Sequence, residues 1–234
     1  MMEIRISTLA ENSASWLKLL AEWGLSILVE VDDTRILVDT GRSIVASHNA
    51  RLMGTEMQNV DKILFSHGHE DHTGGLLDLL AMRNTPIEII AHPEVWSPKY
   101  WRAPDGSTYN YAGIPYQREL AESMGASFTL TKEPVWLSER IVTSGEVPMV
   151  TDYETIDANA CVRTGDGYST DPLRDDQSLF IKTEKGIVII SGCAHRGIIN
   201  TLRHAQNLTG CEDVYAVIGG THLIGASDER INLT

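Results

Sequence analysis

The sequence has 234 residues, of which 42% are hydrophobic and 22% charged, and its formal net charge is -13. These values are ordinary for a globular chain with a sizeable core, and residues 1–234 are expected to form one domain. The acidic excess argues against a large surface for nucleic acid or anionic membrane, because basic patches supply that affinity. A small phosphorylated substrate is compatible with it, since bound metal ions can reverse the local field.

Three cysteines, Cys161, Cys193 and Cys211, are widely spaced and form no CxxC pair. An odd number at this spacing is not a disulfide framework, and it predicts a reducing compartment, the cytoplasm. The first residues lack an apolar run of signal-peptide length, and no stretch approaches 18 uninterrupted apolar residues. No membrane association is therefore expected, and nothing in the sequence indicates an oligomeric state.

The first predicted elements alternate strands with short helices. Residues 3–9 predict an opening strand, and the apolar spacing over 13–23, ended by Gly24, predicts a helix. Residues 25–31 and 35–39 predict a β-hairpin. The remaining elements predicted in this half are a helix at 43–53, a strand at 62–65, a helix at 76–82 and a strand at 86–91.

Residues 96–116 combine six aromatic side chains with proline and glycine, too irregularly for a strand or a helix. A loop of this length is often functional, such as a lid or a pocket wall; the alternative is an insertion that packs its aromatics on the body. Residues 144–176 are polar and read as loops. The other predicted elements are helices at 117–124 and 197–208 and strands at 128–130, 140–143, 178–182, 187–191 and 214–218.

Three histidines and two carboxylates lie within residues 67–72, directly after a predicted apolar strand. In an extended segment, residues i and i+2 point the same way, so His67 and His69 can hold one ion together. The turn that follows can direct Asp71 and His72 toward a second ion. Imidazole and carboxylate suit zinc, iron or manganese. A His-rich surface loop without a role is the less favoured alternative, because two glycines and a helix follow directly.

Single histidines follow three later predicted strands, at His92, His195 and His222. Strand ends that share one edge of a sheet are the usual place for a site in layered α/β proteins. His92 is a candidate to contact substrate or to support a ligand. Two further candidates stay open: Cys193 as a thiolate ligand or a small buried residue, and Asp176 as a carboxylate ligand or part of a solvated acidic loop.

The string His67-x-His69-x-Asp71-His72 after an apolar strand, with later single histidines, resembles the metallo-β-lactamase superfamily. The turn at residues 39–41 matches the superfamily's Asp-x-Gly motif. The resemblance implies an α/β fold, a four-layer αββα sandwich with a binuclear metal site along one edge of its two sheets.

Three further segments, 176–179, 191–198 and 218–223, are similar to one branch of this superfamily. That branch includes archaeal ribofuranosyl-aminobenzene 5'-phosphate synthases, also called dihydropteroate-synthase-like. Its members usually continue past the Gly-Gly-x-His-Leu segment for another helix and strand. Because this sequence stops at Thr234, we expect either that it is a fragment, truncated at its C-terminus, or that the last wall of the pocket is missing or supplied by a partner.

The resemblance also implies a ligand set for two divalent ions, zinc first, with manganese or iron as alternatives. One ion would be held by His67 and His69, the other by Asp71 and His72, with one distant histidine for each. A group near Cys193, or the carboxylate of Asp176, would bridge the ions. The six implied ligands are His67, His69, Asp71, His72, His195 and His222.

These expectations predict a metal-dependent hydrolase in which two cations hold a water and lower its pKa, so that hydroxide forms near neutral pH. Asp71 would orient that hydroxide toward a small-molecule substrate, either a phosphodiester or a compound related to pterins or phosphosugars. A redox di-iron site is an alternative, but oxygen-reducing relatives carry Glu at the position of His69 and a fused flavin domain. A non-catalytic metal-binding or regulatory module is the third possibility.

Overall fold

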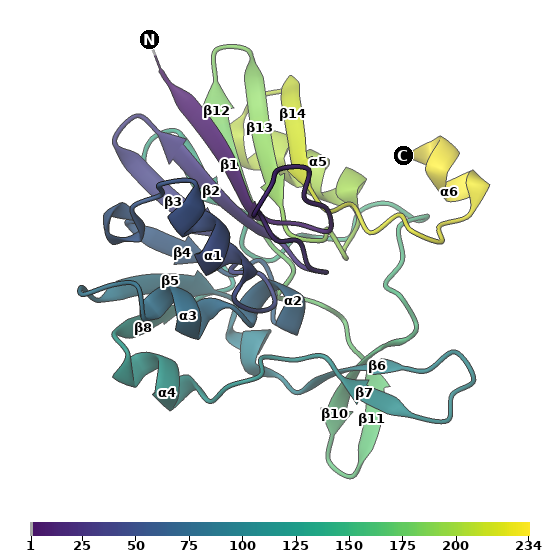
Figure 1. Cartoon of the computed structure of the whole chain (residues 1–234). Helices are drawn as coiled ribbons and strands as arrows, with labels where there is room; N and C mark the ends of the chain where they lie inside the picture. Colours follow the sequence, from purple (N-terminus) through teal and green to yellow (C-terminus); the bar gives the residue numbers. More distant parts are fainter. Residues whose placement is uncertain (1) are drawn as a thin grey trace. The chain divides into compact units, whose positions relative to one another are not determined.

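The computed structural model describes residues 2–234, which divide into two compact units (Figure 1). The first unit comprises Met1–Ala91 and Ala112–Leu130, and the second comprises His92–Tyr111 and Thr131–Thr234. One sheet of six strands belongs to the first unit, and two sheets of four strands belong to the second.

The six-stranded sheet has the order β1-β2-β3-β4-β5-β8. Strands β1 to β3 pair antiparallel, whereas β3, β4, β5 and β8 pair in parallel. The parallel part requires helices between its strands, and it is rich in buried Ile, Leu and Val. The strands are β1 (Ile4–Ala10), β2 (Ser26–Val31), β3 (Thr34–Val38), β4 (Lys62–Leu64), β5 (Ile87–Ala91) and β8 (Ala126–Leu130).

Short helices pack against this sheet in the first unit. Helix α1 contacts β1 and α3, and α3 contacts α4, so the three form one layer (Figure 1). Leu76 and Leu79 of α3 are fully buried beneath that layer. The helices are α1 (Val45–Leu52), η1 (Met57–Asn59), α2 (Glu70–Thr73), α3 (Leu76–Leu80) and α4 (Arg118–Ser123).

One sheet of the second unit has the order β14-β13-β12-β9, and helix α5 (Ile198–Thr209) packs on it (Figure 1). Strands β12 and β13 form the predicted hairpin, and β14 adds in parallel to β13. Phe180, Ile189 and Ala205 are fully buried in the core between helix and sheet. The strands are β9 (Ile141–Thr143), β12 (Ser178–Thr183), β13 (Gly186–Ser191) and β14 (Val214–Gly219).

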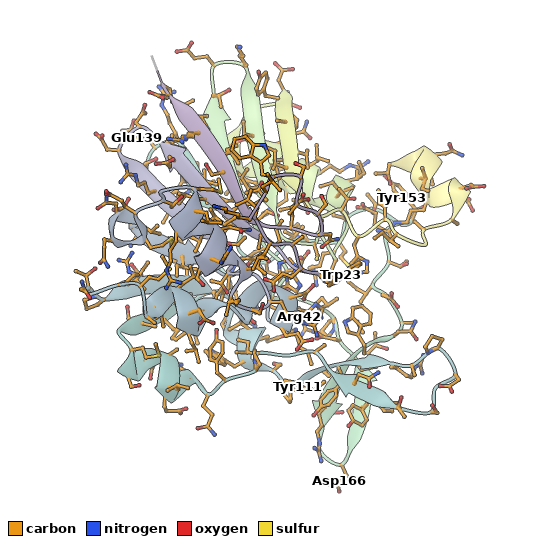
Figure 2. The ribbon with its side chains drawn as sticks, viewed as in Figure 1. Trp23, Arg42, Tyr111, Glu139, Tyr153 and Asp166 are labelled. Carbon is orange, nitrogen blue, oxygen red and sulfur yellow. The ribbon has the colours of Figure 1, made fainter. Side chains whose placement is uncertain are left out.

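The second sheet of this unit has the order β11-β10-β6-β7 and corrects two predictions. Residues 96–116 are not one irregular loop, and residues 144–176 are not all loop. Each contributes a hairpin, and Figure 2 labels Tyr111 on the first and Asp166 at the turn of the second. The elements are η2 (Pro93–Trp96), β6 (Lys99–Arg102), β7 (Tyr109–Tyr111), β10 (Ala160–Thr164) and β11 (Gly167–Thr170); a helix α6 (Asp228–Leu233) follows later.

The helix predicted at residues 13–23 is wrong, because this segment forms bends and turns. Its apolar side chains have nothing to pack against: Trp16 is 77% exposed and Leu17 is 96% exposed. A short helix without a buried face is marginal in water. The side chain of Asn49 instead binds the backbone N–H and C=O of Leu20, which holds the chain in an irregular path.

None of the helices formed by residues 2–234 has the length and apolar character needed to cross a membrane.

Candidate metal centre

Two adjacent parallel strands carry the first group of candidate ligands. The last residue of β3, Val38, pairs with Leu64 of β4, so Asp39 and the residues after β4 leave the sheet at the same edge. Asp39, Ser66 and His67 are all fully buried there. A site at the carboxyl ends of parallel strands is the arrangement that the sequence predicted.

The carboxylate of Asp39 holds this edge together. Its Oδ1 accepts the backbone N–H of Ser66 at 2.7 Å, and its Oδ2 accepts the Ser66 hydroxyl at 2.7 Å. The same Oδ2 lies 2.6 Å from Nδ1 of His72. The Ser66 hydroxyl oxygen in turn lies 2.9 Å from Nδ1 of His67.

This network sets the tautomers of two imidazoles. A carboxylate only accepts hydrogen bonds, so Nδ1 of His72 donates to Asp39. The Ser66 hydroxyl donates to Asp39, so its oxygen accepts from Nδ1 of His67. In both rings the lone pair is therefore on Nε2, and outer contacts of this kind to Nδ1 are typical of metal-binding histidines.

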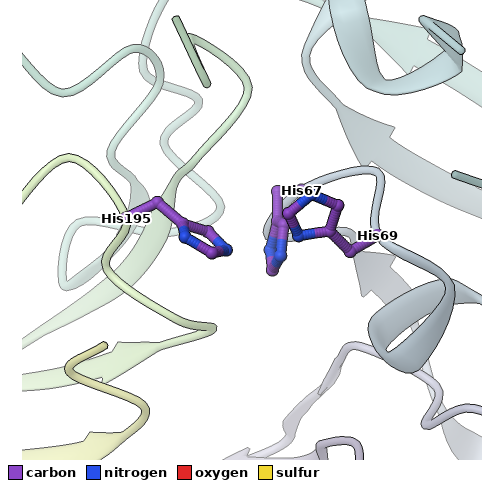
Figure 3. Close-up of side chains that lie close together, drawn as sticks. All are labelled: His67, His69 and His195. Atoms are coloured by element: carbon purple, nitrogen blue, oxygen red, sulfur yellow. The ribbon is translucent and has the colours of Figure 1, made fainter. Parts of the chain in front are cut away.

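The loop brings three imidazoles together within the first unit. The ring centroids of His67 and His69 are 4.6 Å apart, and those of His67 and His72 are 4.3 Å apart. Within each of these two pairs, one ligand nitrogen per ring lies within 4.8 Å of the other, and Figure 3 shows His67 and His69 with their rings close together. An Asp71 carboxylate oxygen lies 3.7 Å from Nε2 of His72. Spacings of this size allow shared ligation of a cation.

The flanking residues pack the loop in place. Glu70 is not part of the histidine cluster, because its carboxylate pairs with Arg42 at 2.6 Å. Gly75 lies directly against the backbone carbonyl of Thr40, where a Cβ atom would overlap that oxygen. The close approach explains why glycine follows the histidine string.

The second group of candidates gathers at one edge of the β12–β14 sheet. Ser178 at the start of β12 and Gly219 at the end of β14 both pair with Ser191, the last residue of β13. The segments that precede β12 and follow β13 and β14 therefore leave this sheet together. They carry Asp176, Cys193, His195 and His222.

His195 and His222 lie side by side in this unit, with ring centroids 4.3 Å apart. Gly219 permits the approach, because it has a φ of 121° and packs on the Ser191 carbonyl without room for a Cβ atom. The Ser191 hydroxyl donates to the carbonyl of Gly220 at 2.8 Å, and the N–H of Gly220 donates to the carbonyl of Gly192 at 2.8 Å. Tight packing between two turns thus joins two histidines that are 27 positions apart in the sequence.

Asp176 is buried, so its placement in a solvated acidic loop is wrong. One carboxylate oxygen accepts the backbone N–H of Arg196 at 3.0 Å, while Oδ1 is buried without a hydrogen-bond partner. Burial raises the pKa of Asp176 to about 7, with a further rise from Asp175 and an opposing effect of nearby backbone N–H groups. A buried carboxylate oxygen that lacks a donor suits a cation.

Two further candidates have distinct environments. Cys193 forms no disulfide and is only half-buried, which does not match the alternative of a small buried residue. His92 is buried, and its Nδ1 accepts the N–H of Glu94 at 3.0 Å. Its Nε2 lies 3.8 Å from a Glu146 oxygen, and burial lowers the pKa of His92 despite the acidic residues around it.

The sequence did not predict a role for three residues that support the candidate site. Buried Glu154 accepts the backbone N–H groups of Ile199 and Asn200 at 2.9 and 2.7 Å, and so caps α5 directly after His195. Ser66 directly precedes the histidine string, but nothing in its position signalled a hydrogen bond to a histidine. Buried Lys99 was hidden in the aromatic segment, where a lone lysine normally signals a surface.

A family model for the metallo-beta-lactamase superfamily matches residues 24–196. The chain belongs to the metallo-beta-lactamase superfamily. This membership confirms the predicted family, and a mixed α/β fold with several sheets confirms the predicted fold class.

Individual known proteins match the chain over most of their length. The 7,8-dihydropterin-6-methyl-4-(beta-D-ribofuranosyl)-aminobenzene-5'-phosphate synthase of Methanocaldococcus jannaschii is 35% identical over 246 residues, with 97% of this chain and 80% of the synthase covered. An uncharacterized protein of the same organism is 32% identical over 228 residues, with coverages of 97% and 82%. The crystal structure of Tm1679, a metal-dependent hydrolase of the beta-lactamase superfamily, matches with 28% identity and a TM-score of 0.81, over 99% of this chain and 81% of that one.

The donor chemistry of this superfamily member fits a metal. In the first unit three imidazoles converge, and the bonds from Asp39 and Ser66 engage Nδ1 of two of them. In the second unit two imidazoles lie together, and a buried carboxylate oxygen of Asp176 lacks a donor. By family and by its histidine clusters, the chain is a metal-dependent, hydrolase-like protein.

Proposed function

We propose that this chain is a hydrolase that uses two divalent ions, zinc in the first instance. The observation that carries the proposal is the Asp39–Ser66 network, which presents Nε2 of His67 and His72 as metal ligands. Burial of a carboxylate costs free energy of desolvation. Contacts that orient imidazoles in this way are typical of histidines that bind metal. The proposed ligands are His67, His69, Asp71, His72, His195 and His222, with Asp176 or Cys193 as a bridging group.

When bound, the ions would supply an activated water and a Lewis acid for the substrate oxygen. The protein's part is to hold the ligands and to place the substrate. Asp71 is only partly buried, so its carboxylate can accept a hydrogen bond from the attacking water and orient it. The aromatic hairpin β6–β7 offers rings on which a planar substrate can pack.

The proposed substrate is a small molecule, either a phosphodiester or a compound related to pterins or phosphosugars. Support for the second class comes from the synthase of Methanocaldococcus jannaschii, whose name contains a dihydropterin and a ribofuranosyl phosphate. The net charge of -13 fits neither nucleic acid nor an anionic membrane as a partner. Three widely spaced cysteines favour the cytoplasm as its location.

Substitution of His69 tests this function. Wild-type protein is expected to bind two zinc equivalents and to hydrolyse a generic phosphodiester, and His69→Ala is expected to lose bound metal and turnover together. His48→Ala is the matched control, because His48 belongs to α1 and binds the carbonyl oxygen of Lys18. Unchanged turnover in the His69→Ala protein would sink the proposal.

A second reaction, synthesis instead of cleavage, is favoured by the identity to the synthase. The same metal ligands would then activate a substrate for bond formation. An assay for a ribofuranosyl-aminobenzene phosphate product, run beside the phosphodiester assay, separates the two. Product formation that depends on His69, without any hydrolysis, would replace the first proposal with the second.

A further inference from the structure

Trp101 of strand β6 lies against both histidines of the second unit. Its indole is nearly parallel to the ring of His222, with an angle of 6° and a centroid distance of 6.2 Å. The ring of His195 lies 6.4 Å away at 45°. These distances fall in the range in which offset aromatic rings attract each other. One indole therefore contacts two of the proposed ligands.

The strand that carries Trp101 is firmly anchored. Lys99 lies two residues earlier, so its side chain leaves the same face of β6. Its ammonium group is buried and pairs with Asp171 at 2.8 Å and with Asp175 at 2.9 Å. A buried ion pair of this kind fixes position well, because separation would leave unpaired charges. Trp101 is thus held at a constant distance from the segment that contains Asp176.

The turn that carries His222 has its own constraint. His222 has a φ of 47°, a left-handed conformation that is uncommon outside glycine. Such backbone conformations persist only where the surroundings enforce them, and they concentrate at functional sites. The packing of Gly219 on Ser191 places the backbone of His222. Packing of the backbone does not fix the rotation of the imidazole about its side-chain bonds. The flat face of the indole can restrict this rotation.

We infer that Trp101 is a positioning residue, whose indole holds the imidazoles of His222 and His195 in the orientation in which they bind metal. The inference rests on the proposed metal centre. An imidazole bound to a cation is more electron-poor than a free one, so its contact with the electron-rich indole is expected to be stronger in the metal-bound protein. Trp101 would then contribute to metal affinity without being a ligand.

Zinc titration in competition with a chelator measures the effect. Trp101→Leu is expected to bind zinc about tenfold more weakly, the typical loss when a group behind a metal ligand is removed. Trp101→Phe keeps an aromatic face and is expected to stay within about threefold of wild type. Trp136→Leu is the matched control, because Trp136 is 46% exposed in the same unit and forms an isolated bridge with Val142.

Cobalt quenching of tryptophan fluorescence gives a second readout, which tests whether Trp101 lies beside the bound ion. Wild-type protein is expected to lose part of its emission when Co²⁺ binds, because Trp101 lies beside two of the ligands. Trp101→Phe is expected to bind Co²⁺ with most of that quenching gone.

Two results would overturn the inference. One is a folded Trp101→Leu protein that binds zinc as tightly as wild type. The other, decisive if the Leu variant does not fold, is undiminished cobalt quenching in Trp101→Phe. Wild-type protein that binds no zinc would refute the proposed function itself, so the two failures are distinguishable.

Discussion

The two groups of histidines are built by different means. In the first unit, His67, His69 and His72 lie within six consecutive residues, and a buried carboxylate holds two of them through hydrogen bonds. In the second unit, His195 and His222 come from separate strands, and packing of turns and an indole brings them together. A local motif can therefore be oriented by one polar network, whereas ligands from distant positions depend on tertiary packing.

The largest expected effect comes from Asp39→Asn. The carboxylate accepts the Ser66 N–H at Oδ1, and it accepts the Ser66 hydroxyl and Nδ1 of His72 at Oδ2. An amide has only one acceptor oxygen, so one side of this network is lost and two imidazoles lose their orientation. Metal affinity is expected to fall about 100-fold, the upper end for such supporting contacts. Chelator competition measures the loss, and Asp78→Asn on the exposed side of α3 is the control. Equal metal affinity of Asp39→Asn and Asp78→Asn would contradict the claim that the Asp39 network orients the histidines of the first unit.

Asp176→Asn tests the second unit in the same way. Its Oδ1 is buried without a donor, so removal of the negative charge should cost about 10-fold in metal affinity. Asp213→Asn, at the exposed turn before β14, is the control. If Asp176→Asn binds metal as tightly as wild type, the buried carboxylate only holds the backbone near Arg196. Packing alone would then explain how His195 and His222 are positioned.

Glu154→Ala is expected to act on stability more than on metal. Two N–H groups at the start of α5 would lose their acceptor, which costs about 2 kcal/mol in the free energy of unfolding. Urea denaturation of the metal-free protein measures this change. Glu154→Gln retains one acceptor oxygen and is expected to lose less. Equal stability of the Ala variant and wild type would show that packing of the turn after His195 does not need this cap.

The smallest expected effect concerns His92, which belongs to neither group. Burial lowers the pKa of His92, so below its ordinary value of about 6.5 the unfolded chain binds the proton more readily than the folded one. The neutral, buried His92 therefore contributes to the free energy of unfolding. This contribution is complete above a pH of about 6.5, and it is lost as the pH falls toward the pKa of His92 in the folded state. In His92→Gln the pH slope of the unfolding free energy should be shallower by up to about one proton. Chelator-treated protein in urea at a series of pH values gives the slope, and parallel curves would contradict the shift.

The contrast also explains what the sequence could predict. The string from His67 to His72 predicted candidate ligands and identified the superfamily because all its information is local. The supporting bond from Ser66 and the contact of Trp101 depend on side-chain geometry, which spacing does not encode. The β6–β7 hairpin was mistaken for a loop because its partner strand β10 lies about 60 positions later. The apolar pattern of residues 13–23 was mistaken for a helix because nothing in the sequence shows that its apolar face stays exposed.

The proposed function assigns one distant histidine to each of two ions. Two double-mutant cycles on zinc affinity test this assignment most directly: His69→Ala combined with His195→Ala, and His69→Ala combined with His222→Ala. Ligands of one ion are not independent, so in one of the two cycles the double variant is expected to lose scarcely more binding free energy than the more weakly binding single variant. If the losses add in both cycles, the two groups of histidines serve separate sites and the proposed function is contradicted.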